Sequence, residues 1–143
     1  DGQDPDSLQQ SVRNITQGEP VVLGLDAIGG KASQALAASL SPQGRLVLYG
    51  LLSGDPCSIS AHDLIFRNIH VQGFWLANWF SDPENRQKAK NVYPALIEIA
   101  AQNVLRMNVE KIYELSDINE AIVHSAQGGR QGKVLLKGMY FEE

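Results

Sequence analysis

Two strand-length apolar runs, joined by a glycine turn and an alanine-rich stretch, constrain the fold of this chain most. Residues 21–25 (VVLGL) and 46–50 (LVLYG) are continuous apolar runs, a pattern typical of strands buried on both faces. Between them, Gly29-Gly30 leads into a helical pattern with one apolar side: Ala32, Ala35, Leu36 and Leu40. A strand, helix and strand within about thirty residues form a βαβ crossover. The two strands are therefore predicted to be parallel.

Further elements follow the same alternation. A helix is predicted after Asp6 or Ser7, ending at Gly18, and a short helix over residues 64–66. Residues 69–75 alternate apolar and polar side chains, as an exposed or edge strand does. A helix from Ser81 to about Gln102 is expected to be kinked or divided by Pro94. Its predicted buried stripe comprises Val92, Leu96, Ile97, Ile99 and Ala100.

The pattern changes near residue 109, where a short strand, a helix over residues 116–126 and a last strand over 134–136 are predicted. Three parallel strands with helices between them make half of a doubly wound sheet, and no G-x-G-x-x-G is present. We therefore predict an α/β fold with a partial, Rossmann-like parallel sheet. Residues 1–105 are predicted to form the second half of a nucleotide-binding domain, beginning with a loop over residues 1–5, and residues 106–143 a separate C-terminal segment.

Charge and composition narrow the class of function. The net charge is -4, and the 12 Lys and Arg residues are scattered, so nucleic acid is an unexpected partner. The single cysteine, Cys57, allows no internal disulfide and fits a reducing compartment. No apolar run reaches the roughly 18 residues that a membrane crossing requires, and no signal-peptide pattern opens the chain.

Three loops leave the predicted strands where ligands bind in open parallel sheets, outside the carboxyl ends. They are residues 26–30, 50–54 and 73–76, and each contains glycine. These glycines could serve turn chemistry alone or let backbone amides approach a ligand. Close by, Phe74, Trp75, Trp79 and Phe80 could pack a core or subunit interface, or could form a wall of an apolar pocket.

Other chemistries lack their motifs. Residues 25–32 imitate a phosphate-binding loop, but Leu25 and Ala32 stand where that loop needs glycine and Ser or Thr. The three histidines and Cys57 share no zinc-ligand spacing, so no metal site is predicted. The serines lack the G-x-S-x-G elbow of serine hydrolases.

Residues 22–30, 44–50 and 132–136 together resemble the medium-chain dehydrogenase/reductase superfamily, over residues 8 to 138. Residues 64–76 (LIFRNIHVQGFWL) resemble the zinc-free trans-2-enoyl thioester reductases, with quinone reductases as close relatives. The resemblance implies cofactor contacts from Tyr49, Gly50, Leu51, Leu52, Phe74, Trp75, Leu76 and Lys133, and from Asp26 and Gly29 near the adenosine and ribose. Enoyl reductases tend to carry a second glycine where this chain has Leu51.

The implied activity is hydride transfer from NADPH, or NADH, to the C=C bond of a 2-enoyl thioester. The alternatives are a quinone or enone reductase, a zinc-type alcohol dehydrogenase, or a non-catalytic dimerisation module. No catalytic residue is assigned, because the family's catalytic groups lie in its N-terminal domain, and the isolated chain is expected to be inactive. The resemblance also implies that residues 106–143 would pack on that absent N-terminal catalytic domain. A homodimer through residues 69–75, no membrane partner, and a cytoplasmic or (in a eukaryote) mitochondrial location are also expected.

Overall fold

The computed structural model describes residues 5–138, which fall into two compact units divided after Arg86. The first four residues, where part of the initial loop was predicted, lie outside the described residues. The first unit contains, in order, α1 (Pro5–Thr16), β1 (Leu23–Asp26), α2 (Lys31–Ser39), β2 (Arg45–Leu48), α3 (Ala61–Ile65), β3 (His70–Gly73) and α4 (Leu76–Ser81). Helix α5 (Pro83–Ala101) begins in the last residues of the first unit and continues into the second. The domain boundary at residue 105 stays a prediction.

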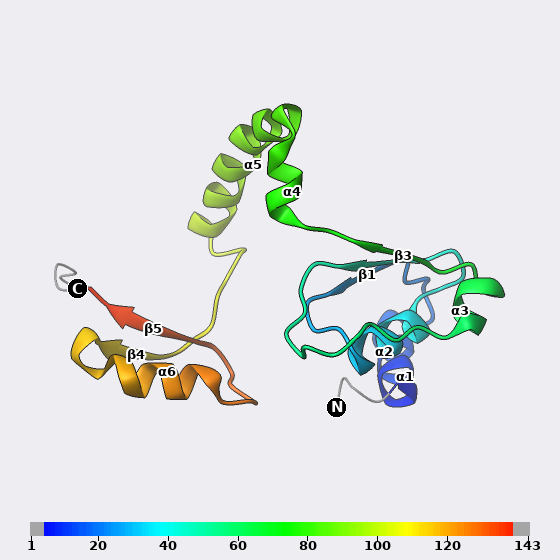
Figure 1. Ribbon diagram of the computed structural model, residues 1–143, viewed down its shortest axis with the longest axis horizontal. Coiled ribbons are helices and arrows are strands. Elements are labelled where there is room, and N and C mark those ends of the chain that lie inside the picture. Colours follow the sequence, from blue (N-terminus) through cyan, green and yellow to red (C-terminus); the bar gives the residue numbers. More distant parts are fainter. Residues whose placement is uncertain (1–4, 139–143) are drawn as a thin grey trace. The chain divides into compact units, whose positions relative to one another are not determined.

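The first unit is built on a three-stranded parallel sheet in the order β1-β2-β3. Helix α2 packs on β1 and β2, α1 packs on α2, and both lie on one side of the sheet in Figure 1. This arrangement confirms the predicted βαβ crossover and the parallel α/β class. Strand β3 is an edge strand with exposed residues throughout, as its alternating sequence predicts.

The core of this unit lies between α2 and the sheet. It is formed by four buried side chains: Ala37, Leu40, Leu46 and Ile69. Burying Leu46 alone contributes roughly 2 kcal/mol. The Arg67 guanidinium closes the core, donating to the carbonyl oxygens of Ala37 and Leu40 at the end of α2 and pairing with Asp63 at 2.6 Å. These bonds add side-chain donors to the carbonyl groups at the carboxyl end of α2, where a helix lacks its full set of backbone partners.

The prediction that the first two strands are buried on both faces was wrong. Gly24 and Asp26 are buried against the helices, but Leu23 and Leu25 point to the other face, and Leu25 is 60% exposed. The reason is that helices α1 and α2 cover only one face. A continuous apolar run shows that the side chains are suited to burial. Whether both faces of the strand are buried depends on helices covering both faces of the sheet.

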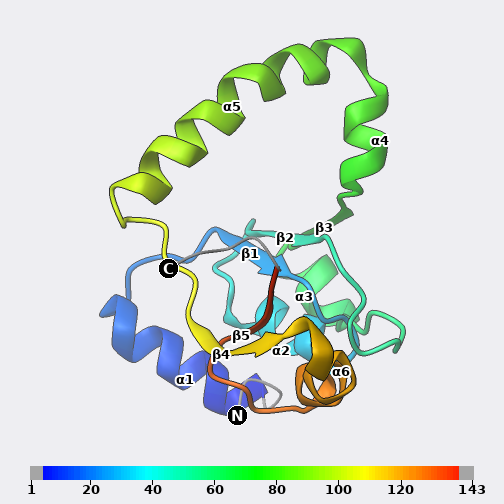
Figure 2. The same cartoon turned by 90° about the vertical axis from the view of Figure 1, so that its left-hand side faces the viewer.

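Helix α5 differs from its prediction in the burial of its side chains. It runs uninterrupted from Pro83 to Ala101 (Figure 2), so Pro94 does not divide it, and the alternative that Pro94 kinks the helix stays a prediction. The side chains predicted to form the buried stripe of this helix are exposed; Ile97, for example, is 68% exposed. The helix buries Ala89 instead. No other described element packs extensively against this helix, which explains the exposure. Among the described residues, no helix has both the length and the apolar character needed to cross a membrane.

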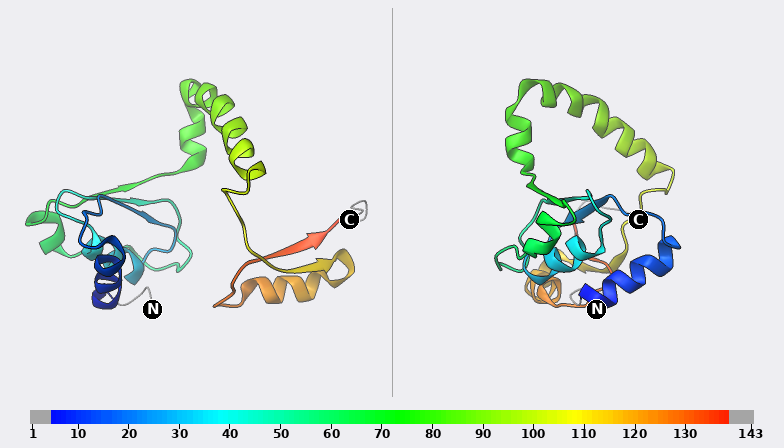
Figure 3. Two further views of the ribbon diagram at one scale, coloured as in Figure 1. Left: turned by 180° about the vertical axis from the view of Figure 1, so that it is seen from behind. Right: turned by 90° about the vertical axis from the view of Figure 1, so that its right-hand side faces the viewer.

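The second unit consists of a small parallel pair of strands covered by a helix. Its elements after α5 are β4 (Val109–Glu114), the short 3-10 helix η1 (Leu115–Asp117), α6 (Ile118–Ala126) and β5 (Lys133–Lys137). Strands β4 and β5 pair in parallel, and α6 packs along them (Figure 3). Tyr113 and Ala121 are buried where the helix meets the strands. The strand, helix and strand predicted from residue 109 onward are confirmed.

Candidate functional site

The three predicted loops leave the sheet at one edge. The strand register places Asp26 beside Leu48, and Leu48 beside Gly73, so the three parallel strands end side by side. The predicted loops, residues 26–30, 50–54 and 73–76, therefore emerge at the same carboxyl edge. The geometric requirement for a shared ligand cleft at that edge is met.

Backbone hydrogen bonds join the first two of these loops. The N–H groups of Leu52 and Ser53 donate to the carbonyl oxygens of Ala27 and Ile28 at 3.1 and 2.9 Å. The Ser53 hydroxyl adds a bond to the Ile28 oxygen at 2.7 Å. Two loops that are far apart in the sequence thus form one continuous ledge beside the strand ends. Ser53 carries much of this connection and was not predicted as a site residue.

Asp26 sits at the base of the ledge with its side chain turned inward. It is 1% exposed, and its Oδ1 accepts hydrogen bonds from the backbone N–H groups of Ile28 and Gly29 at 2.7 and 3.0 Å. Its Oδ2 accepts a bond from the Ser33 hydroxyl at 2.5 Å. Gly29 and Gly30 have φ of 80° and 59°, a region in which residues other than glycine are strained. The carboxylate therefore organises the turn that opens α2.

The ionisation of Asp26 reflects two opposing effects. Burial of the carboxyl opposes its charged form and would raise the pKa. The hydrogen bonds from Ser33, Gly29 and Ile28 favour the charged form and together outweigh burial, so the pKa of Asp26 lies below its ordinary value. With both oxygens engaged inside the protein, this carboxylate has a structural task at neutral pH. A contact between Asp26 and a ribose, implied by the resemblance, stays a prediction.

Gly50 lies where the two loops approach most closely. A Cβ atom at this position would lie 2.5 Å from the carbonyl oxygen of Ala27, so only glycine fits. The Tyr49 N–H donates to the main-chain carbonyl oxygen of Asp26, but no described residue accepts from the N–H groups of Gly50 or Leu51. Two donors are thus available at the ledge for an external acceptor such as a carboxamide oxygen.

Exposed apolar side chains surround these donors. Those predicted as cofactor contacts are Tyr49, Leu51, Leu52, Phe74, Trp75 and Leu76, each at least 40% exposed. The Phe74 N–H donates to the Leu48 carbonyl at 2.7 Å, which fixes the start of the third loop beside the ledge. The Trp79 and Phe80 rings pack edge to face at 5.1 Å, but Trp75 is 73% exposed, so the four aromatics do not form a core in this unit.

Lys133 belongs to the second unit, where it is the first residue of β5. Its side chain is exposed, and its N–H donates to the Asn108 carbonyl at 2.7 Å. Nine of the ten predicted residues thus gather at one edge of the first unit. The role of Lys133 as a cofactor contact remains a prediction.

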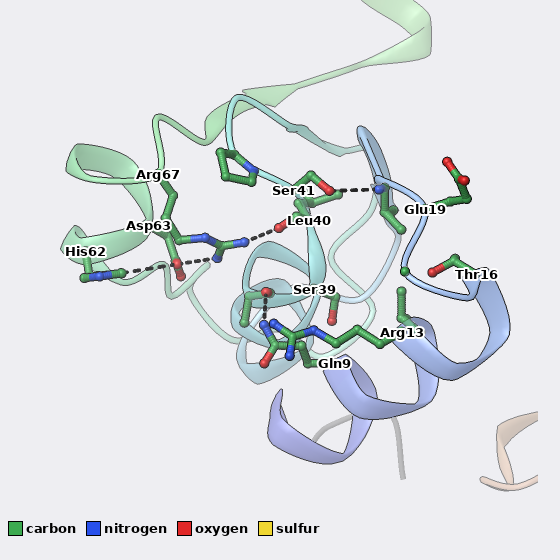
Figure 4. Close-up of a pocket in the computed structure, with 15 residues that line it drawn as sticks. Gln9, Arg13, Thr16, Glu19, Ser39, Leu40, Ser41, His62, Asp63 and Arg67 are labelled. Atoms are coloured by element: carbon green, nitrogen blue, oxygen red, sulfur yellow. Dashed lines mark hydrogen bonds and ion pairs between the residues drawn. The ribbon is translucent and has the colours of Figure 1, made fainter.

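A cavity of about 620 Å³ lies at the opposite end of the sheet, where the chain enters the strands. Figure 4 shows Arg13, Ser41 and Arg67 among its lining side chains. None of the ten predicted cofactor residues, all within the described residues, lines it. Its charged side chains balance, with Arg13 and Arg67 against Glu19 and Asp63, and Arg67 is engaged in closing the core. The cavity is therefore a weaker candidate than the carboxyl edge.

Metal-ligating side chains do not gather in the part of the chain described by the structure: no group of three or more His, Cys, Asp or Glu residues could hold a metal ion there. Cys57 is free and exposed.

The family described as zinc-binding dehydrogenase matches residues 2–101, and the chain belongs to it. The mitochondrial enoyl-[acyl-carrier-protein] reductase of Dictyostelium discoideum is 35% identical over 114 residues, which are 80% of this chain and 32% of that protein. This membership confirms the resemblance to the medium-chain dehydrogenase/reductase superfamily.

Two solved structures have the same fold. A protein from Bacillus thuringiensis, assigned as an NADPH:quinone reductase, is 32% identical with a TM-score of 0.69, covering 92% of this chain and 40% of that chain. The complex of Etr1p with NADP and crotonyl-CoA is 22% identical with a TM-score of 0.67, covering 96% and 38%. The chain thus spans about a third of the Dictyostelium relative and about two fifths of each solved chain.

Proposed function

We propose that this chain supplies the nicotinamide side of an NADP(H) site in a reductase. The observation that carries the proposal is the ledge at the carboxyl edge, where Gly50 and Leu51 offer unused backbone donors among exposed apolar side chains. A nicotinamide ring presents the complementary chemistry, a flat apolar body with a polar carboxamide. When bound, the cofactor supplies the hydride. The ledge would orient the ring through the N–H groups of Gly50 and Leu51.

The substrate that we favour is a 2-enoyl thioester. The Dictyostelium relative is an enoyl-[acyl-carrier-protein] reductase, and the Etr1p complex contains crotonyl-CoA. In that reaction, hydride adds to the β-carbon of the conjugated double bond and a proton then reaches the α-carbon. Phe74, Trp75 and Leu76 provide exposed apolar surface suited to an acyl chain. If the protein comes from a eukaryote, we propose that it is mitochondrial. If it comes from another source, we propose that it is cytoplasmic.

A quinone substrate is the second candidate, and Leu51 is the residue that favours it. Enoyl reductases tend to carry glycine there, whereas the Leu51 side chain is 61% exposed beside the proposed ring site and would narrow it. The Bacillus thuringiensis structure, at 32% identity, is assigned to NADPH:quinone reduction.

Binding experiments on the chain separate these proposals. NADPH should raise its melting temperature and shift the indole resonance of Trp75, whereas a non-catalytic dimerisation module would show neither effect. Gly50→Val should abolish the NADPH effect, and a Gly73→Ala control should retain its fold, because a Cβ at Gly73 would meet no atom within 4 Å. Addition of crotonyl-CoA or of a benzoquinone to the NADPH-bound chain then identifies the substrate class by which one perturbs Trp75. Steady oxidation of NADPH by the chain with either compound would contradict the expectation that it is inactive alone.

A further inference from the structure

Ser53 binds one carbonyl group of the first strand-end loop through two donors. Its N–H and its hydroxyl donate to the Ile28 oxygen at 2.9 and 2.7 Å. The Ser53 Oγ also accepts a hydrogen bond from the Asp55 N–H at 3.1 Å. A hydroxyl donates one hydrogen bond while it accepts others, so both side-chain bonds form at once. Ser53 therefore fixes its own backbone, and that of the residues after it, against the first loop.

The backbone around this serine forms a closed turn that follows directly on the proposed ring-binding donors. The Gly54 N–H donates to the Leu51 carbonyl at 3.1 Å, which closes the turn, and Gly54 has a φ of 72°, where glycine is favoured. The Leu52 N–H donates to the Ala27 carbonyl at 3.1 Å. Gly50 and Leu51 carry the two N–H groups without an acceptor among the described residues. The direction of these N–H groups therefore depends on where the turn is held.

The Ser53 side chain lies over the turn that opens α2. A Cβ atom at Gly29 or at Gly30 would lie 3.4 Å from Ser53 Oγ. A Cβ at Gly29 would also lie 3.0 Å from a methyl carbon of Leu51. Because glycine has no side chain, the second loop packs closely on this turn. The Ser53 side chain is exposed, so water competes for its bonds, and their loss should displace the loop without unfolding the unit.

We propose that Ser53 is a positioning residue: by holding the second loop on Ile28, it directs the N–H groups of Gly50 and Leu51 toward the nicotinamide carboxamide. This inference rests on the proposed function for the identity of the ligand. The loop connection itself depends only on contacts within the first unit. Two donors that are held in place before binding lose less freedom when the ligand arrives, and this raises affinity. Ser53 acts through these two amides and needs no contact of its own with the cofactor.

The first test examines the loop connection without cofactor. Ser53→Ala removes both side-chain bonds. Ser58→Ala is the matched control, at an exposed serine whose side chain makes no hydrogen bond with the residues that the structure describes. Amide hydrogen exchange at positions 52 and 53 should accelerate about threefold to tenfold in Ser53→Ala and should not change in Ser58→Ala. Unchanged exchange in a folded Ser53→Ala variant would overturn the inference.

The second test separates positioning of the nicotinamide from a general structural role. It compares NADPH with the ADP-ribose phosphate that is left when nicotinamide is removed from NADP. In Ser53→Ala, the dissociation constant for NADPH should rise about threefold to tenfold, and that for the compound without nicotinamide should stay unchanged. Equal weakening of both ligands, or no weakening of NADPH binding, would overturn the inference.

Rescue by a conservative variant completes the test. Ser53→Thr keeps the hydroxyl and should retain the NADPH affinity of the unaltered chain. A loss in Ser53→Thr as large as that in Ser53→Ala would contradict the role of the hydroxyl. Failure of the unaltered chain to bind NADPH would reject the proposed function and this role of Ser53 with it, while exchange at positions 52 and 53 would still report on the loop connection.

Discussion

The backbone of Gly50 lies directly against the carbonyl of Ala27, so that a methyl group on Gly50 would lie 2.5 Å from that oxygen. Gly50→Ala should therefore lower the free energy of unfolding of the first unit by about 1–3 kcal/mol, because two hydrogen-bonded loops must separate. Urea denaturation measures the change. Gly73→Ala is the control and should leave the midpoint nearly unchanged, since open space surrounds that position. Equal midpoints for the two variants would show that the loops are not closely packed.

Asp26 should be a large contributor to the stability of the same unit. Asp26→Asn removes a charge that three donors stabilise and forces an amide N–H₂ toward one of them. A loss of about 2 kcal/mol is expected. Asp55→Asn, at an exposed carboxylate nearby, is the matched control and should cost little. A similar small effect of both substitutions in urea denaturation would contradict the structural role of Asp26.

The contribution of Asp26 should also depend on pH. Its pKa in the folded protein is below the ordinary value, so the folded state favours the charged form. The resulting stability is fully present above the unfolded pKa of about 3.9 and is lost as the pH falls through the folded pKa. The stability difference between the unaltered chain and Asp26→Asn should be constant near neutrality and shrink in acid. A difference that grows below pH 4 would reverse the sign of this argument.

The free edge of β3 provides a test of the proposed homodimer. His70 and Phe74 donate their N–H groups toward β2, so the alternation along the strand directs the N–H of Val71 to the open edge. Val71→Pro should keep the fold and weaken self-association, whereas His70→Pro should disrupt the sheet by removing an internal bond. Sedimentation measures association, and circular dichroism measures the fold. A folded Val71→Pro variant that associates as tightly as the unaltered chain would argue against pairing through β3.

Glu110 on β4 places its Oε1 3.0 Å from Nε2 of His124 on α6, and the pKa of its carboxyl group lies below the ordinary value. The hydrogen bond with His124 is the main cause that lowers its pKa, followed by the bond from the N–H of Gln131. His124→Gln should therefore raise the Glu110 pKa toward its ordinary value, measured from the carboxyl carbon resonance as pH is varied. The stabilising effect of the Glu110 bonds to His124, Gln131 and Gly132 is present above the unfolded pKa and disappears as the pH falls through the folded one. An unchanged midpoint in His124→Gln would show that the two groups are uncoupled.

The sequence was sufficient to predict the parallel crossover, because an apolar run, a glycine turn and an apolar helical side have one common arrangement. It also placed Asp26, Gly50 and Gly73 at one edge, since parallel strands end together. Burial was less predictable: Leu25 and Ile97 are apolar side chains whose exposure depends on which layers cover them. The inward turn of Asp26 had a local signal, an aspartate at the end of a strand three residues before Gly29, because aspartate side chains often bond to the backbone of their own turn. The pairing of His124 with Glu110 had none, because it joins residues from different elements.

The hydrogen bonds from Leu52 and Ser53 to Ala27 and Ile28 join the first two strand-end loops into one structural unit. The second loop takes its hydrogen-bond acceptors from the first, because Leu52 and Ser53 donate to the Ala27 and Ile28 carbonyls. Transplanting residues 49–53 alone from a distant family member should give a poorly folded hybrid, whereas moving residues 26–30 with them should restore folding. Evolution of cofactor preference on this scaffold would accordingly proceed through paired changes in both loops.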